Sequence, residues 1–453
     1  MVGTYAAINL RMLFESRDET MRIAILCPVF PPEPAPAGEM ARQLAARLAE
    51  SGHEVVVLTQ FPNRPAGKLF PGYKRRLRSV EEIDGFRLLR CPNWLLGPRR
   101  RALSRLLENI SFGLSSCLNL ARELRPDVVL METWPLFAME ITQQFCSLRK
   151  VPVITYVQDC YPEALEYTGL IPLNGWLARM LRRWDGSICR RSANVIAISA
   201  GMKELLCVSR QLDRARVTVI PNWNECKGFG SRERDWTWRT ENGIPPNVFV
   251  ALFAGTLGHV SGAGVLVEVA RRLSARTDLL IVCAGEGVLK AEMQQTAKVA
   301  GLQNLRFVPV QPPEKVAVMH AAADALLLTT QAGYPDSSVP SKLIAYLAAG
   351  RPVLCSARDD STVASIVREA GAGLVTRAED PEAIASTLLY FADHPTEALE
   401  MAGNARRCFE DKFTFERAYG SLEALLLEAA GGVVNTSRPD SGKVHVARKT
   451  EEA

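Results

Sequence analysis

Short apolar runs alternate along this chain with longer segments whose apolar residues recur at helical spacing. Strands are predicted in the first half at 22–27, 54–59, 86–90, 127–131, 152–157, 194–198 and 217–220. Helices are predicted between them near 37–50, 100–124, 136–148, 174–191 and 200–209. The pattern starts again in the second half, with strands predicted at 248–254, 279–283, 305–308, 325–329, 353–356 and 374–376. Such alternation forms parallel sheets covered by helices on both faces. The sequence therefore predicts an α/β fold with two doubly wound domains and a cleft between them.

Composition divides the chain further. Residues 221–246 are rich in Asn, Pro, Gly, Trp and charge, which is typical of a linker. The predicted segments are a disordered extension at 1–20, an N-terminal domain at 21–220, this linker, a C-terminal domain at 247–410, a helix at 411–431 and a disordered tail at 432–453. The first segment lacks the long apolar core of a signal peptide. It is either a loose extension or a stretch upstream of the true start codon.

The residues that usually bind metals are scattered. No two of the 11 cysteines lie within four positions of each other, and the five histidines are equally dispersed. We therefore expect no metal site, and we expect the cysteines to act as small buried apolar residues in a reducing cytoplasm. The longest uncharged run, 242–267, is interrupted by prolines and glycines, so it is not predicted to span a membrane.

Positive charge is concentrated in the first half. Residues 21–214 contain 27 Lys and Arg against 18 Asp and Glu. Clusters at 74–78 and 99–101 lie near a largely apolar segment at 109–120. This pattern suits a surface that docks on anionic lipid, although a solvated basic face over ordinary core helices would look the same. Nucleic acid is a weaker candidate partner, because no basic and aromatic motif accompanies the charge.

A candidate anion site lies in the segment 338–353. A loop follows the strand predicted at 325–329, and Ser341 is expected to cap a short helix that Gly350 and Pro352 end. Lys342 would then stand at the helix N-terminus, where free N–H groups and the helix dipole favour an anion. A plain helix start with a solvated lysine is the alternative.

Two glycine-rich loops strengthen this interpretation. The loop 255–264 follows one predicted strand, and the loop 284–287 follows the next. Glycine lets a backbone approach a phosphate closely, and ligands of open parallel sheets bind at the carboxyl ends of the strands. Three such loops favour a nucleotide-diphosphate pocket over three unrelated turns.

The order of several motifs resembles one family. The matching segments are 30–33 (FPPE), 52–59 (GHEVVVLT), 158–163 (QDCYPE), 219–223 (VIPNW), 339–342 (VPSK) and 348–352 (AAGRP). The first two resemble the family 4 retaining glycosyltransferases, which have the GT-B fold. The others resemble a branch with sugar transferases of bacterial O-antigen, capsule and exopolysaccharide assembly, such as N-acetylfucosaminyl transferases. The resemblance covers about 21–430.

The resemblance implies where substrates bind. In GT-B enzymes the C-terminal domain binds the nucleotide sugar, the N-terminal domain binds the acceptor, and no metal or other cofactor is obligatory. The implied donor-binding residues are Gly255, Gly258, His259, Ser261, Glu286, Ser338, Ser341 and Lys342. The implied acceptor-binding residues are Gly38 and Glu39, and the implied catalytic residues are Asp159 and Glu163. Three of these have structural alternatives: Gly38 as a helix N-cap, Glu163 as a first-turn helix acid and Glu286 as a solvated loop carboxylate.

The chain departs from the family at three places. Many members have two glutamates eight positions apart, of which the second holds the ribose hydroxyls; here these positions are Ser337 and Ala345. The loop after the first C-terminal strand lacks the usual Arg and Lys, and only His259 could be cationic there. The family's N-terminal histidine is replaced by the segment 132–135.

These observations favour an enzyme. The leading hypothesis is a retaining glycosyltransferase that moves a sugar from a UDP-linked donor to a lipid-linked or polysaccharide acceptor, in the cytoplasm or on the inner face of the plasma membrane. A catalytically silent GT-B protein that regulates a partner transferase is the alternative. A sugar-nucleotide epimerase fits less well, because such enzymes need more carboxylates and histidines in the cleft.

Overall fold

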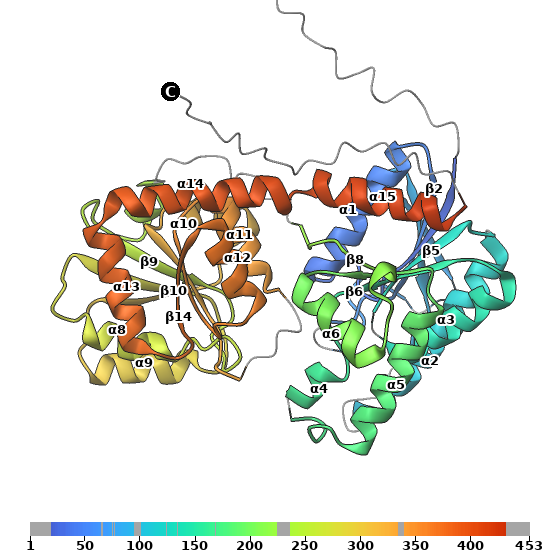
Figure 1. Cartoon of the computed structure of the whole chain (residues 1–453), viewed down its shortest axis with the longest axis horizontal. Coiled ribbons are helices and arrows are strands. Elements are labelled where there is room, and N and C mark those ends of the chain that lie inside the picture. Colours follow the sequence, from blue (N-terminus) through green and yellow to red (C-terminus); the bar gives the residue numbers. More distant parts are fainter. Residues whose placement is uncertain are drawn as a thin grey trace, which may run out of the picture.

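The computed structural model describes residues 20–64, 67–74, 76, 78–94, 101–123, 125–133, 135–167, 169–223, 236–333 and 339–431. These residues form two α/β domains that lie side by side and are joined by a pair of long C-terminal helices (Figure 1). Each domain has one largely or wholly parallel sheet, so the predicted fold class is confirmed. Apart from Thr20, the predicted disordered ends at 1–20 and 432–453 lie outside the described residues.

The N-terminal domain has an eight-stranded sheet in the order β3-β4-β2-β1-β5-β6-β7-β8. Its strands are β1 (Arg22–Leu26), β2 (Glu54–Gln60), β3 (Ser79–Ile83), β4 (Phe86–Cys91), β5 (Val128–Glu132), β6 (Val153–Val157), β7 (Asn194–Ala197) and β8 (Val217–Val219). Its helices are α1 (Pro36–Glu50), α2 (Arg101–Glu123), α3 (Leu136–Arg149), α4 (Glu163–Tyr167), α5 (Trp176–Arg191) and α6 (Ala200–Arg210). The central strands are buried on both faces, which explains their continuous apolar runs.

Strand β3 was not predicted. It is the edge strand, it pairs antiparallel with β4, and its sequence SVEEI has no apolar run. The turn between the two strands is Asp84-Gly85, with φ of 48° and 81°. Positive φ at both turn residues is typical of a tight hairpin, for which Asp-Gly is a favoured pair. This dipeptide was the available signal.

The C-terminal domain has a six-stranded parallel sheet in the order β11-β10-β9-β12-β13-β14. Its strands are β9 (Phe249–Ala254), β10 (Leu279–Ala284), β11 (Leu305–Val308), β12 (Ala325–Thr329), β13 (Val353–Ala357) and β14 (Gly373–Arg377). Its helices are α7 (Trp236–Glu241), α8 (Val265–Arg272), α9 (Lys290–Val299), α10 (Pro313–Ala321), α11 (Ser341–Ala349), α12 (Thr362–Ala370), α13 (Pro381–Asp393) and α14 (Pro395–Lys412). A buried apolar cluster covers each face of this sheet.

The segment predicted as a linker is partly built into both domains. Trp223 is buried in the N-terminal domain, where its indole N–H donates to Gln43 at 2.8 Å. At the other end, Trp238 of α7 is buried in the C-terminal core, and Arg239 forms an ion pair with Asp324 at 2.7 Å. The prediction of a linker over 221–246 was therefore too long at both ends.

The C-terminal helical segment also differs from the prediction. Instead of one helix at 411–431, α14 ends at Lys412 and α15 (Phe415–Ala429) begins after a two-residue break. Helix α15 runs back across the N-terminal domain, where Leu422 and Leu426 join the core (Figure 1). The chain thus crosses between the domains twice, which fixes the two walls of the cleft.

The described residues also bear on the membrane and cysteine expectations. No described helix is both long and apolar enough to cross a bilayer. The ten described cysteines are buried, as expected, and no disulfide joins any of them. Among the described residues, no group of three or more His, Cys, Asp or Glu is placed to hold a metal ion.

Candidate functional site

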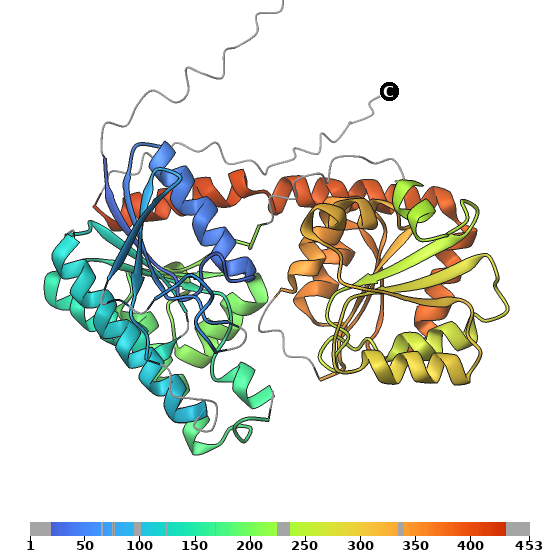
Figure 2. The ribbon, with the colours of Figure 1, turned by 180° about the vertical axis from the view of Figure 1, so that it is seen from behind.

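A cavity of about 910 Å³ lies between the two domains. Helix α1 forms part of its N-terminal wall, and this helix lies on the side of its domain that faces the other domain (Figure 2). The opposite wall comes from the loops after β9 and β10 and from the start of α11. These are carboxyl ends of parallel strands and a helix N-terminus, where the fold leaves N–H groups for a ligand.

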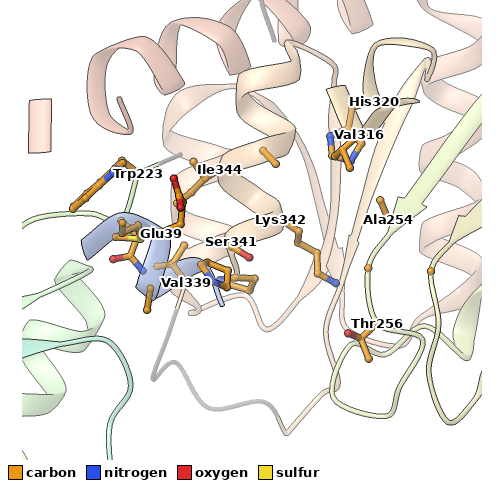
Figure 3. A pocket seen from close by; sticks show the side chains of 18 of the residues that line it. Glu39, Trp223, Ala254, Thr256, Val316, His320, Val339, Ser341, Lys342 and Ile344 are labelled. Atoms are coloured by element: carbon orange, nitrogen blue, oxygen red, sulfur yellow. The ribbon is translucent and has the colours of Figure 1, made fainter. Parts of the chain in front are cut away.

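Lys342 is the principal cation of this cavity. Its side chain extends from α11 toward the end of β9, where Ala254 and Thr256 lie (Figure 3). The ammonium lies 4.5 Å from the centre of the Phe253 ring. Burial lowers the pKa of Lys342 to about 8, and no hydrogen bond or ion pair to the ammonium is formed by the described residues. A desolvated cation without a counter-ion favours an anionic ligand.

No side chain among the described residues caps the start of α11. Pro340 is the N-cap residue, with no side-chain hydrogen bond, and Ser341 is the first helical residue. The prediction that Ser341 caps the helix was wrong, because Pro340 occupies the N-cap position and Ser341 is already helical. Gly350 ends the helix in the left-handed conformation, as predicted. An uncapped N-terminus beside a lysine is a suitable anion site, although Ser338 and Ser337 lie outside the described residues.

Tyr346 fixes α11 against the sheet. Its hydroxyl accepts a hydrogen bond from the Ala254 N–H at 2.9 Å and donates to the Ala254 carbonyl at 3.2 Å. Tyr346 lies one turn after Lys342 on α11, and Gly255 directly follows Ala254 in the chain. The two hydrogen bonds therefore set the distance between Lys342 and Gly255. A Cβ at Gly255, where φ is 145°, would lie 3.6 Å from the Lys342 ammonium nitrogen. Glycine therefore leaves the ammonium accessible here.

The two glycine loops pack edge to edge. A Cβ on Gly285 would lie 1.9 Å from the Gly255 carbonyl oxygen, and one on Gly287 would lie 2.2 Å from the Leu257 carbonyl oxygen. The Leu257 N–H donates to the Glu286 carbonyl at 2.8 Å. These glycines are thus needed for contact between the loops, and the contact presents Gly255 and Glu286 together to the cavity.

The remaining predicted donor residues are placed differently. Gly258, His259 and Ser261 do not line the cavity. The Ser261 hydroxyl accepts from the Gly258 N–H at 3.2 Å and donates to the Thr256 carbonyl at 2.8 Å, so it holds the loop in shape. Glu286 lines the cavity, but its carboxylate is largely exposed and pairs with Lys290. Glu286 therefore has features of both alternatives, because it lines the cavity and its carboxylate is solvated.

Of the two residues predicted to bind the acceptor, Glu39 lines the cavity and Gly38 does not. The Glu39 carboxylate accepts from Arg42 at 2.7 Å, within the same helix. Gly38 is the third residue of α1 and not its N-cap. A Cβ there would lie 2.7 Å from the Val29 carbonyl oxygen, so glycine permits α1 to approach the loop after β1.

The two predicted catalytic acids have separate environments. Asp159 follows β6 and lines the cavity, and burial raises its pKa. Glu163 does not line the cavity. Its carboxylate accepts hydrogen bonds from Arg210 at 2.6 Å and from Arg182 at 2.9 Å. Burial alone would raise the pKa of Glu163, but these arginines outweigh burial and lower it. The structure therefore does not bring Glu163 to the cleft, and its surroundings are those of a structural ion pair.

Several lining residues were not predicted. Among them are Gln158, Ile198, Asn222, Trp223, Val310, Gln311, Val316, Met319, His320 and Val339. Burial lowers the pKa of His320 to about 4, and its ring packs edge-on against Tyr346 at 5.3 Å. Asn222 accepts a hydrogen bond from the Tyr156 hydroxyl at 3.1 Å. Only Gln158, Asn222, Trp223 and Val339 lie in motifs that the sequence had singled out.

Comparison with known families divides the chain at the same place as the structure. The family described as "Glycosyl transferase 4-like domain" matches residues 37–223. The family described as "Glycosyl transferases group 1" matches residues 234–408. Together these matches span the two α/β domains.

Two relatives have similar sequences. A protein of Escherichia coli K12 named as a putative colanic acid biosynthesis glycosyl transferase, WcaI, is 26% identical over 394 residues, covering 84% of this chain and 95% of WcaI. The D-rhamnosyltransferase WbpZ of Pseudomonas aeruginosa PAO1 is 25% identical over 285 residues, covering 62% of this chain and 68% of WbpZ.

Solved structures share the fold at lower identity. Anabaena Alr3699/HepE in complex with UDP has a TM-score of 0.66 and 14% identity, covering 90% of this chain and all of that one. Sucrose-phosphate synthase of Thermosynechococcus elongatus has a TM-score of 0.68 and 17% identity, covering 90% of this chain and 98% of that one.

Proposed function

The chain belongs to the glycosyltransferases with the GT-B fold, and we propose that it transfers a sugar with retention from a UDP-linked donor to a lipid-linked acceptor. The product would be an intermediate of a bacterial surface polysaccharide such as O-antigen, capsule or exopolysaccharide. The observation that carries this proposal is Lys342 in the interdomain cavity, a desolvated ammonium at a helix start, to which the described part of the chain offers neither a counter-ion nor a side-chain cap.

The donor diphosphate would bind at α11. Its negative charge would meet the Lys342 ammonium, the first-turn N–H groups of α11 and the backbone at Gly255. The sugar would then point toward the N-terminal wall, where Asp159 and Glu39 lie. The structural neighbour Alr3699/HepE has been crystallised in complex with UDP, which supports the choice of nucleotide.

The reaction needs positive charge at the leaving diphosphate and a proton acceptor near the attacking hydroxyl. The acceptor hydroxyl oxygen forms a bond to the anomeric carbon on the face from which the diphosphate leaves, so that the configuration is retained as the bond from that carbon to the diphosphate oxygen breaks. The electron pair leaves on the diphosphate, where Lys342 and the α11 dipole stabilise it. The hydroxyl proton passes to Asp159, whose raised pKa makes it a better base than Glu163, which its arginines hold ionised. Because these groups supply the charge stabilisation, we expect full activity in the presence of a chelator.

The names of two relatives support the proposed pathway. WcaI is named for colanic acid biosynthesis and WbpZ as a rhamnosyltransferase. A lipid-linked acceptor would place the enzyme on the inner face of the plasma membrane as a peripheral protein. The test is a panel of UDP, GDP and dTDP sugars, screened first by calorimetry and then by release of free nucleotide. Failure of every nucleotide to bind would reject the proposal.

A regulatory protein without catalytic activity is the second candidate. Ala345 lines the cavity at the place where many relatives have the glutamate that holds the ribose hydroxyls. Loss of that contact would weaken the donor site. Nucleotide binding without measurable transfer or donor hydrolysis would favour this candidate.

A further inference from the structure

The loop after α4 and the start of α5 expose a group of large apolar side chains. We refer to residues 170–183 as the lip, which projects from the lower edge of the N-terminal domain in Figure 1. The exposed fractions are 72% for Leu170, 78% for Leu173, 72% for Trp176 and 45% for Met180. Single exposed apolar residues are common, but four within eleven positions form a patch that marks a contact surface.

Basic residues share this surface. Trp176, Arg179, Met180 and Arg183 occupy positions i, i+3, i+4 and i+7 of α5, so they lie on one helix face, and all four are exposed. The opposite face is buried and includes Ala178 and Ile188. The segment 169–184 contains no Asp or Glu. The exposed face is thus apolar and cationic.

An ion-pair network holds the lip in place. Glu166 accepts hydrogen bonds from the Asn174 N–H and from Arg182, both at 2.6 Å. Arg182 also donates to Glu163, and Glu163 pairs with Arg210 of α6. The loop is therefore tied to α4, α5 and α6 at its base. These part-buried polar contacts hold the backbone of the lip at Asn174 and give Glu163 a structural role.

We propose that the lip inserts into the headgroup region of an anionic bilayer. Tryptophan, leucine and methionine can enter the boundary between headgroups and acyl chains, while arginine extends to lipid phosphates. Each cation near such a surface favours binding to anionic lipid. The complete lack of acidic residues in 169–184 makes a bilayer a better partner than a second copy of this chain, whose surface carries both signs of charge.

The lip lies close in sequence to the proposed acceptor site. Asp159 lines the cavity, α4 begins at Glu163, and the lip follows α4 directly. Helix α4 lies on the side of its domain that faces the other domain (Figure 1), so a bilayer docked on the lip would lie near the cleft-facing side of the N-terminal domain. This placement suits an acceptor whose lipid remains in the membrane while its sugar enters the cavity. Only the entry of the acceptor sugar into the cavity rests on the proposed function, because docking of the lip on a bilayer can be measured without any substrate.

The test is flotation of the full chain with vesicles of phosphatidylcholine, with and without phosphatidylglycerol. We expect the wild type to float with the anionic vesicles. The double variant Leu173→Glu/Trp176→Glu should lower the partition coefficient by about tenfold or more. The matched control is Leu148→Glu, which alters an equally apolar residue, 85% exposed on α3 outside the lip, and should bind as the wild type does.

A second variant separates charge from apolar insertion. Arg179→Gln/Arg183→Gln should lose about fivefold per residue on anionic vesicles and little on neutral ones. Equal flotation of the wild type and the Leu173→Glu/Trp176→Glu variant would overturn the proposal. So would a change of oligomeric state in that variant, which would assign the lip to a second copy. Intact UDP-sugar binding with failed docking rejects the lip alone, whereas docking without nucleotide binding rejects the proposed enzyme alone.

Discussion

Replacement of the Lys342 ammonium by an uncharged side chain of similar length should have opposite effects on donor binding and on stability. Lys342→Met keeps an apolar side chain of similar length and removes the ammonium, which lies 4.5 Å from the centre of the Phe253 ring. In the free protein this charge is desolvated and no described residue offers it a counter-ion. In the donor complex it would meet a diphosphate.

The effect on stability follows from the pKa. Burial depresses the pKa of Lys342 from its ordinary value of 10.5 to about 8. For a lysine with a depressed folded pKa, the folded state resists protonation, so the destabilisation is fully present below pH 8 and is lost as the pH rises to about 10.5. Since the side chain is partly exposed to the cavity, we expect Lys342→Met to raise the free energy of unfolding at neutral pH by about 1–3 kcal/mol, and not at high pH.

The effect on binding has the opposite sign. A hydrogen bond to a charged group contributes about 1.5–3 kcal/mol, so the variant should bind UDP about ten to a hundred times more weakly. A bound diphosphate should also raise the pKa of Lys342 above its free value of about 8. At about pH 9 the wild type should therefore take up close to one proton on binding, and the variant none.

Calorimetry in two buffers with different ionisation enthalpies measures this proton uptake directly. Thermal unfolding across the same pH range measures the stability. The matched control is Lys315→Met, which removes an exposed lysine of α10 that pairs with Glu241 and lies outside the cavity. The assignment of α11 as the diphosphate site would be refuted if Lys342→Met bound UDP as tightly as the wild type and the wild type took up no proton on binding.

Four further substitutions test the site. Asp159→Asn should lower turnover and leave the donor dissociation constant unchanged. Glu163→Gln should chiefly lower the free energy of unfolding, by about 3–5 kcal/mol, because it leaves the buried Arg210 partly unpaired. If this variant loses turnover but keeps wild-type stability, Glu163 is catalytic after all. Tyr346→Phe should cost about 1–3 kcal/mol of stability in denaturant unfolding, because the Ala254 N–H loses its acceptor; a wild-type midpoint would contradict this. Ala345→Glu should tighten UDP binding by about tenfold if the cavity keeps room for the ribose contact, and calorimetry showing weaker binding with a lower melting temperature would indicate overpacking instead.

The sheets could be predicted because their strands are covered on both faces. Such strands have continuous apolar runs that can be recognised without knowledge of their neighbours. Strand β3 escaped detection because an edge strand exposes alternate residues, and two of its five residues are glutamates. The domain on which α15 packs could not be predicted either. Its apolar face is visible in the sequence, but nothing local indicates that it packs on the first domain and not on the second.

Four of the eight residues predicted to bind the donor line the cavity: Gly255, Glu286, Ser341 and Lys342. Gly255, Ser341 and Lys342 follow strands of one parallel sheet, and such strands deliver their carboxyl ends to one edge. His320 could not be found in this way, because it reaches the cavity from the body of α10 and carries no motif. The sequence analysis singled out the glycines of these loops, but the structure gives some of them a role other than access for a phosphate. Gly285 and Gly287 serve contact between two loops as much as access for a ligand.

A motif alone does not show which of its two acids, Asp159 or Glu163, faces the cavity. Asp159 and Glu163 lie four residues apart in one motif, so sequence spacing treats them alike. Their difference comes from Arg182 and Arg210, which follow 19 and 47 residues after Glu163 and converge on its carboxylate only in the folded chain. That convergence commits Glu163 to holding the base of the lip and leaves Asp159 facing the cavity with a raised pKa. If the lip docks on a membrane as proposed, the same motif would join the proton acceptor to the element that brings the acceptor lipid within reach.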